Sequence, residues 1–83
     1  MLQPKIIKGP GDILLKYMNY RGINIHKMAI NLDVSIEFLE SLLKNEAHIT
    51  IEMANKLSKY FKNSRDFWIN AEIQYNFNKI LDS

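Results

Sequence analysis

The sequence predicts an all-α protein built from five helices. Apolar residues recur at spacings of three and four along nearly the whole chain, which is the period of an amphipathic helix. Alternation of apolar and polar residues, the pattern of a half-buried strand, never lasts long enough to predict one. The chain has 83 residues and contains no linker, internal repeat or low-complexity tract, so we expect one domain over 1–83.

The first helix is expected to begin at Pro10 and to end before Gly22. Proline is tolerated in the first turn of a helix, and Asp12 is favourable near the positive end of the helix dipole. Glycine suits the position that ends a helix in a left-handed conformation. The residues in front of this helix, 1–8, are predicted to form an extended arm.

The next two helices are expected over about 25–32 and 36–44. Asn24 and Ser35 stand directly in front of them, and both residue types are favoured as N-caps. The first turn of the third helix should therefore begin just after Ser35 and present its side chains outward.

The spacing between these two helices is that of a helix-turn-helix. Ala29 is a small residue that lets the second of the pair approach the first closely. Asp33 follows four residues later, where the turn requires a residue that tolerates positive φ. The apolar residues that would join the pair are Met28, Leu32, Val34, Leu39 and Leu42.

The last two helices follow a loop at 45–49. Thr50 is expected to cap the fourth helix and Ser64 the fifth, which should cover about 64–82. The fifth helix carries apolar residues on two faces, and two faces need two partners. We therefore expect one face to join the domain's own core and the other to dimerise, although the whole helix folding back onto the domain is the alternative. The predicted dimer interface comprises Trp68, Ile73, Phe77 and Ile80.

Charge is unevenly distributed along the chain. The formal net charge is only +2, which names no partner. Residues 28–54 carry one basic and five acidic side chains, whereas 1–27 and 55–83 each carry five basic ones. The acidic segment contains the helix-turn-helix, the part that would enter a DNA groove.

The sequence offers no catalytic site, metal site or cofactor site. There is no cysteine, and neither of the two histidines, His26 and His48, has a carboxylate at metal-ligand spacing. Glu37 and Glu40 lie one helical turn apart, but nothing indicates a pocket that would raise the pKa of either. No leader or membrane-length apolar run is present, so we expect a cytoplasmic protein without membrane contact that is not an enzyme.

Several motifs together resemble the HigA/VapI-type antitoxin family of XRE/Cro-type helix-turn-helix proteins. The match covers nearly the whole chain and is most specific at the start of the last helix. Its motifs are Pro10-Gly11-Asp12-Ile13-Leu14, Gly22-Ile23, the positions Ala29, Leu32, Val34 and Ser35, Ile49-Thr50, and Phe67-Trp68-Ile69-Asn70 with Tyr75. The resemblance implies a lambda-repressor-like five-helix bundle that forms a homodimer. It also implies binding to a palindromic double-stranded DNA operator in its own promoter, and neutralisation of a cognate RNA-cleaving toxin protein.

The predicted DNA-binding residues lie around the start and the outer side of the third helix. They are Lys27, Ser35, Ile36, Glu37, Phe38, Ser41 and Lys44. The two lysines would hold phosphates, Glu37 could accept from cytosine N4, and the two apolar side chains could pack on thymine methyl groups.

Acidic residues at this surface also leave a second interpretation open. Relatives tend to carry Ser, Arg or Gln where this chain has Glu37 and Glu40, and each carboxylate repels phosphate. Ile36 and Phe38 could instead form a protein-binding patch with the carboxylates as its solvated border. The alternative function is thus a helix-turn-helix-derived protein-interaction module with weak or lost DNA binding.

Overall fold

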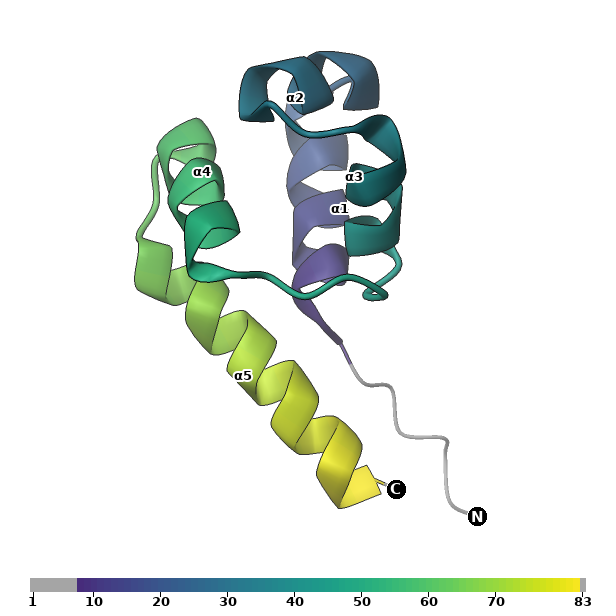
Figure 1. Cartoon of the computed structure of the whole chain (residues 1–83), viewed down its shortest axis with the longest axis vertical. Coiled ribbons are helices and arrows are strands. Elements are labelled where there is room, and N and C mark those ends of the chain that lie inside the picture. The colour runs from purple at the N-terminus through teal and green to yellow at the C-terminus, as the bar shows by residue number, and fades with distance from the viewer. Residues whose placement is uncertain (1–7, 83) are drawn as a thin grey trace.

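The structure, a computed structural model, describes residues 8–82 and shows five helices and no strand in that range (Figure 1). The predicted all-α fold is confirmed. The extended arm predicted at 1–8 lies outside the described residues except for Lys8. The helices are α1 (Pro10–Arg21), α2 (Ile25–Leu32), α3 (Ile36–Leu43), α4 (Ile51–Phe61) and α5 (Arg65–Asp82).

Side-chain caps begin four of these helices where the sequence predicts them. In each, a side-chain oxygen accepts a hydrogen bond from a backbone N–H in the first turn, which satisfies a donor that has no partner within the helix. The four acceptors and their donors are Asn24 with His26 (2.8 Å) and Lys27 (3.2 Å), Ser35 with Phe38 (3.0 Å), Thr50 with Met53 (3.2 Å), and Ser64 with Phe67 (3.0 Å).

Left-handed residues end the first two helices, as predicted. Gly22 has φ of 64°, and Asp33 has φ of 57° in the turn between α2 and α3. The backbone N–H of Val34 donates to the carbonyl of Ala29 at 3.0 Å and closes this turn. The chain therefore reverses between α2 and α3 within a few residues, as a helix-turn-helix requires.

The core is formed by all five helices, and its aromatic part lies where α1, α4 and α5 meet. Trp68 of α5 is fully buried and packs against the rings of Tyr17, Phe61 and Phe67, at centroid distances of 5.8, 5.8 and 5.2 Å. Its indole N–H donates to Asn63 Oδ1 at 2.9 Å, so the one polar atom of this large side chain is satisfied. The stripe predicted on α4 is buried in the same core and consists of Met53, Ala54, Leu57 and Phe61.

The start of α1 is bonded to the end of α3 through Asn45. Asn45 Oδ1 accepts from the N–H of Gly11 at 2.8 Å, and its Nδ2 donates to Asp12 Oδ2 at 3.0 Å. A Cβ on Gly11 would lie 2.3 Å from the carbonyl oxygen of Leu42, so only glycine permits this close approach. Asn45 itself has φ of 60°, a left-handed conformation that asparagine tolerates better than most residues.

The fifth helix begins in the core and continues beyond it. Its first turns pack beside α4, and its last turns extend past the other helices (Figure 1). None of the described helices is both long enough and apolar enough to span a lipid bilayer.

Candidate nucleic-acid interface

The first turn of α3 is presented at the surface by its cap. Ser35 and Glu37 are exposed, and Ile36 and Ser41 are half-buried. The opposite side of the helix is fixed by Leu39 and Leu42, which are 0% and 1% exposed. The orientation predicted for this helix is therefore the one that the structure has.

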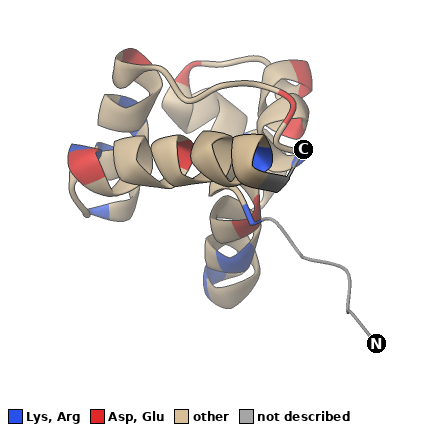
Figure 2. Cartoon of the chain, turned by 90° about the horizontal axis from the view of Figure 1, so that it is seen from below, with Lys and Arg blue, Asp and Glu red and all other residues tan. Residues whose placement is uncertain are grey.

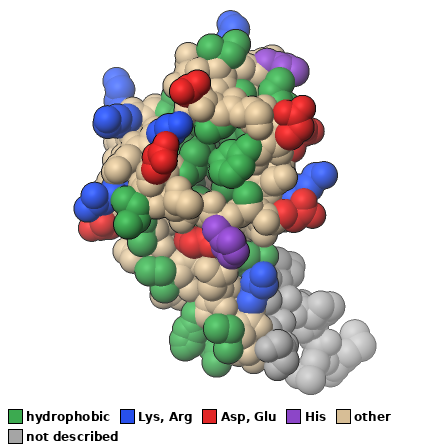
Figure 3. Space-filling model, viewed as in Figure 1, with side chains coloured by type: hydrophobic (Ala, Val, Ile, Leu, Met, Phe, Trp, Pro, Cys, Tyr) green, Lys and Arg blue, Asp and Glu red, His purple; other side chains and the backbone are tan. Residues whose placement is uncertain are grey.

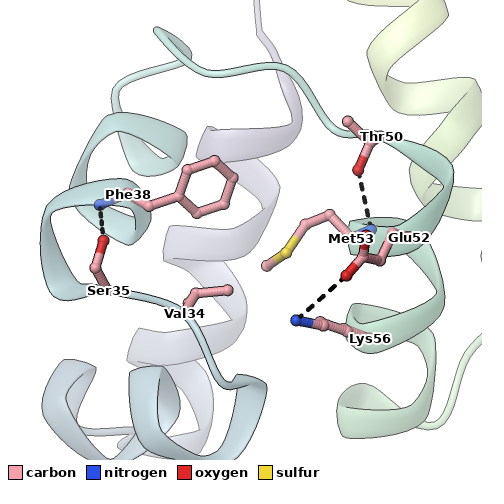
Figure 4. Close-up of a pocket in the computed structure, with 7 residues that line it drawn as sticks. All are labelled: Val34, Ser35, Phe38, Thr50, Glu52, Met53 and Lys56. Carbon is pink, nitrogen blue, oxygen red and sulfur yellow. Dashed lines mark hydrogen bonds and ion pairs between the residues drawn. The ribbon is translucent and has the colours of Figure 1, made fainter.

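Phe38 occupies a different position from the other predicted contacts. It is half-buried, and its ring lies in a hollow of about 350 Å³ between α3 and α4, facing Met53 (Figure 4). Val34 lines the same hollow from the α3 side, and Lys56 and Glu52 line it from α4 (Figure 4). The ring thus faces α4, and its contact with DNA stays a prediction.

A second hollow separates the starts of α2 and α3. It encloses about 560 Å³, and its lining includes His26 and Ile30 from α2 and Ile36 from α3. Lys27 follows His26 in the first turn of α2 and is exposed. Lys27 does not line this hollow, and its contact with a phosphate stays a prediction.

Lys44 lies at the other end of α3. It is the exposed residue that follows the last helical residue, Leu43, so α3 is one residue shorter than predicted. A helix of eight residues is about 12 Å long, and this length separates Lys44 from Ser35. Lys44 therefore lies at the opposite end of α3 from the capped first turn, and its contact with a phosphate stays a prediction.

Acidic side chains surround this surface. Glu37, Glu40 and Glu46 are exposed, and in the part of the chain that the structure describes no cation lies within ion-pair distance of them. Glu52 is compensated by Lys56 at 3.8 Å. Figure 3 shows acidic side chains on both sides of the hollowed apolar patch, and Figure 2 shows the basic positions spread over several helices. The electrostatic conflict predicted from the sequence is therefore present on the surface.

A contact between His48 and Glu72 was missed by sequence reasoning. Nδ1 of His48 lies 2.7 Å from Oε2 of Glu72, which is on α5. Partial burial raises the pKa of Glu72, but hydrogen bonds from His48, the N–H of Ile49 and Asn76 together lower it below its usual value. The two residues are 24 positions apart, so no local spacing could reveal the pair. Among the described residues no group of three or more potential metal ligands gathers.

The predicted dimer interface divides into two parts. Trp68 is 0% exposed and belongs to the core of its own chain, so its assignment to a dimer interface is wrong. The reason is that Trp68 packs against rings from α1, α4 and α5 of its own chain. Ile73, Phe77 and Ile80 are 55%, 48% and 73% exposed, and a dimer contact through them stays a prediction.

The chain is similar to bacterial helix-turn-helix proteins. It is 38% identical over 64 residues to the uncharacterized HTH-type transcriptional regulator YbaQ of Escherichia coli (strain K12), covering 76% of this chain and 57% of YbaQ. It is 33% identical over 73 residues to virulence-associated protein A of Dichelobacter nodosus, covering 86% of this chain and 72% of that protein. Its fold matches the solved structure of the Pseudomonas aeruginosa antitoxin HigA with the higBA promoter, with a TM-score of 0.84 and 26% identity over 90% of this chain and 83% of that one.

No protein-family model matches the chain. The chain spans little more than half the length of YbaQ, at 57%. The relatives are a transcriptional regulator, a virulence-associated protein and an antitoxin, and none of these names describes an enzyme.

Proposed function

Since the chain belongs to the HigA/VapI-type family of XRE/Cro-type helix-turn-helix proteins, we propose that it is an antitoxin-type transcriptional regulator. In this proposal it binds operator DNA as a homodimer in the cytoplasm and neutralises a cognate RNA-cleaving toxin. The observation that carries it is the geometry of α3, whose capped first turn is exposed while its other side is fixed in the core. The relative of the same fold whose structure includes a promoter adds support.

The proposed DNA contacts follow from what each exposed group can recognise. Lys27 and Lys44, at the two ends of the helix-turn-helix, would each neutralise a phosphate. Glu37 would accept from the N4 amino group of cytosine, and Ile36 would pack on a thymine methyl group. A two-fold dimer would place two α3 helices about 34 Å apart, in successive major grooves.

We propose that dimerisation uses the second half of α5. Ile73, Phe77, Ile80 and Leu81 are at least 48% exposed and follow one another at spacings of four, three and one, which places them on one side of the helix. A continuous apolar surface of this kind marks an interaction site on a small protein. The proposed toxin is the other protein that could cover this apolar surface.

The protein-interaction module is the second candidate function. It is favoured by the three exposed carboxylates, Glu37, Glu40 and Glu46, beside an apolar hollow that contains Phe38. Each carboxylate opposes the phosphate backbone, whose neutralisation supplies most nonspecific affinity.

One titration decides between the two candidates. Wild type and the triple variant Glu37→Gln, Glu40→Gln, Glu46→Gln are titrated at fixed salt against the gene's own upstream duplex and a scrambled duplex. A regulator prefers the upstream duplex by a factor of ~10³ or more, and the triple variant loses that preference while its overall affinity rises. Absence of any wild-type preference would reject the regulator and favour the protein-interaction module.

Matched variants test the assigned contacts. Lys27→Ala or Lys44→Ala should weaken binding to all sequences alike and reduce the salt slope by roughly 0.9 per lost contact in each half-site. Glu37→Gln should change which sequence is preferred, whereas Asp66→Asn, the same kind of charge removal on α5, should not. If all of these variants bind the operator as wild type does, the assigned face is wrong.

The toxin partner requires a separate experiment. The product of a short open reading frame adjacent to the gene is expressed alone and together with this chain. Growth arrest by the neighbour alone, relieved by co-expression, is the expected result. Arrest that co-expression leaves unchanged would remove the antitoxin part of the proposal and leave the DNA-binding part intact.

A further inference from the structure

The loop between α3 and α4 is held to the rest of the protein at two places. Its first residues are supported by Asn45, which bonds to the start of α1, and by the carbonyl of Ser41, which accepts from Glu46 N–H at 2.8 Å. Its last residues, His48 and Ile49, turn away from α3 towards the start of α4 and need other support.

That support comes from one side chain of α5. Glu72 Oε1 accepts from the backbone N–H of Ile49 at 3.1 Å, and Oε2 lies 2.7 Å from His48 Nδ1. Asn76, one turn further along α5, donates to Oε2 at 3.0 Å and fixes the carboxylate from the other side. The Glu72 side chain is only 12% exposed, whereas that of His48 is 76% exposed. The bonds to Ile49 and Asn76 are part-buried and the contact with His48 is exposed, so the bond to Ile49 is the better sheltered of the two loop contacts.

Ile49 is the residue through which this contact acts on the helices. Its side chain is buried at 7% exposure, and it directly precedes Thr50, the cap of α4. A shift of Ile49 therefore moves the start of α4, whose Met53 faces Phe38 of α3 across the hollow (Figure 4).

We propose that Glu72 is a positioning residue for operator binding. It touches no DNA but, by holding Ile49, keeps the start of α4 and the adjoining side of α3 in the orientation that the groove requires. This inference rests on the proposed function, because operator affinity is the property that Glu72 controls. It also gives α5 a role beyond packing, because α5 then fixes the loop that connects α3 to α4.

The test compares Glu72→Ala with Glu72→Gln in the full chain, at a temperature well below the midpoint of unfolding of each variant. Glutamine keeps an oxygen that can accept from Ile49 N–H, whereas alanine leaves that donor unpaired. We expect Glu72→Ala to weaken operator binding about 10-fold and Glu72→Gln less than about 3-fold, since an unpaired buried donor costs enough for such a change. The matched control is Gln74→Ala, an exposed position on the same helix, which should bind as wild type does.

Two further readouts separate positioning from general stability. The salt slope of Glu72→Ala should equal that of wild type, because no phosphate contact is lost. Amide exchange of Ile49 in the free protein should accelerate in Glu72→Ala but not in Gln74→Ala. If Glu72→Ala does not fold, His48→Ala removes one of the two loop contacts from an exposed side chain and should give a smaller loss of affinity in the same direction.

The outcomes distinguish the inference from the proposed function. Wild-type operator binding together with unchanged affinity in Glu72→Ala would overturn the inference alone, and so would an equal loss in Glu72→Gln. Absence of operator binding by the wild type would overturn the proposed function and the inference with it, whatever the exchange of Ile49 shows.

Discussion

The first half of α5, Arg65–Ala71, and its longer second half, Glu72–Asp82, both carry apolar side chains but differ in their surroundings. In the first half, Arg65–Ala71, Trp68 is fully buried among rings from α1, α4 and α5 itself. In the second half, from Glu72 onwards, the large apolar side chains Ile73 and Phe77 are about half exposed. The apolar composition of a helix thus shows how much apolar surface it has to bury. The packing of the other helices determines which part of that surface is buried within the chain.

The largest expected effect is the loss of stability on removing Trp68, the buried residue of the first half of α5. Trp68→Ala should lower the free energy of unfolding by ~3–5 kcal/mol, because it removes a large buried side chain and leaves a cavity. That is a large fraction of the stability of a small domain. Urea and thermal unfolding would measure it. The matched aromatic removal in the second half, Phe77→Ala, should cost much less, and equal costs would contradict the distinction between the halves.

The second effect concerns association rather than folding. Ile73→Glu should shift the chain from dimer to monomer, because a charge would have to be buried in the predicted interface. Light scattering at micromolar concentration should give about twice the chain mass for wild type and closer to one chain mass for the variant. Ile30→Glu is the matched control, since Ile30 lies on α2 and is 77% exposed. A strictly monomeric wild type at about 100 µM would contradict the dimer, as would an equal shift in the control.

The contrast between the halves also shows how far the sequence could predict this molecule. Caps such as Ser35 and Thr50 were predictable because a cap and the turn that it satisfies are local. The left-handed Asp33 was predictable for the same reason. Periodicity places Trp68 and Phe77 on different faces of α5, but it could not decide which face joins the core, because both faces are apolar and only the neighbouring helices distinguish them.

Contacts between distant segments were beyond prediction for a related reason. Asn45 meets Gly11 across 34 positions, and Glu72 meets His48 across 24. No periodic pattern in the sequence marks either pair. Taken by itself, each residue looks like a common loop residue or a solvent-exposed helix residue. The candidate site was predicted at the level of α3 and its flanking lysines, whereas the support behind it depends on tertiary packing.

The smallest effect is expected at Glu72, the residue where the two halves of α5 meet. Its pKa in the folded chain is lowered, because hydrogen bonds from His48, Ile49 and Asn76 outweigh the partial burial that raises it. A carboxyl whose folded-state pKa lies below its unfolded value stabilises the protein above the unfolded pKa. That stabilisation is lost as the pH falls through the lowered folded-state pKa.

The stability difference between wild type and Glu72→Gln should therefore be constant from about pH 7 to pH 5. Wild type should then lose stability relative to Glu72→Gln as the pH falls below the unfolded pKa of a glutamate, about 4.3. Urea unfolding across this range measures it, and the other carboxyl groups cancel because both proteins contain them. Gln74→Ala, which removes no titrating group, should differ from wild type by the same amount at every pH. A Glu72→Gln difference that is equally flat would mean that the carboxylate contributes no more than a neutral amide. The second half of α5 would then be tied to the body of the protein by hydrogen-bond geometry alone, without a contribution from charge.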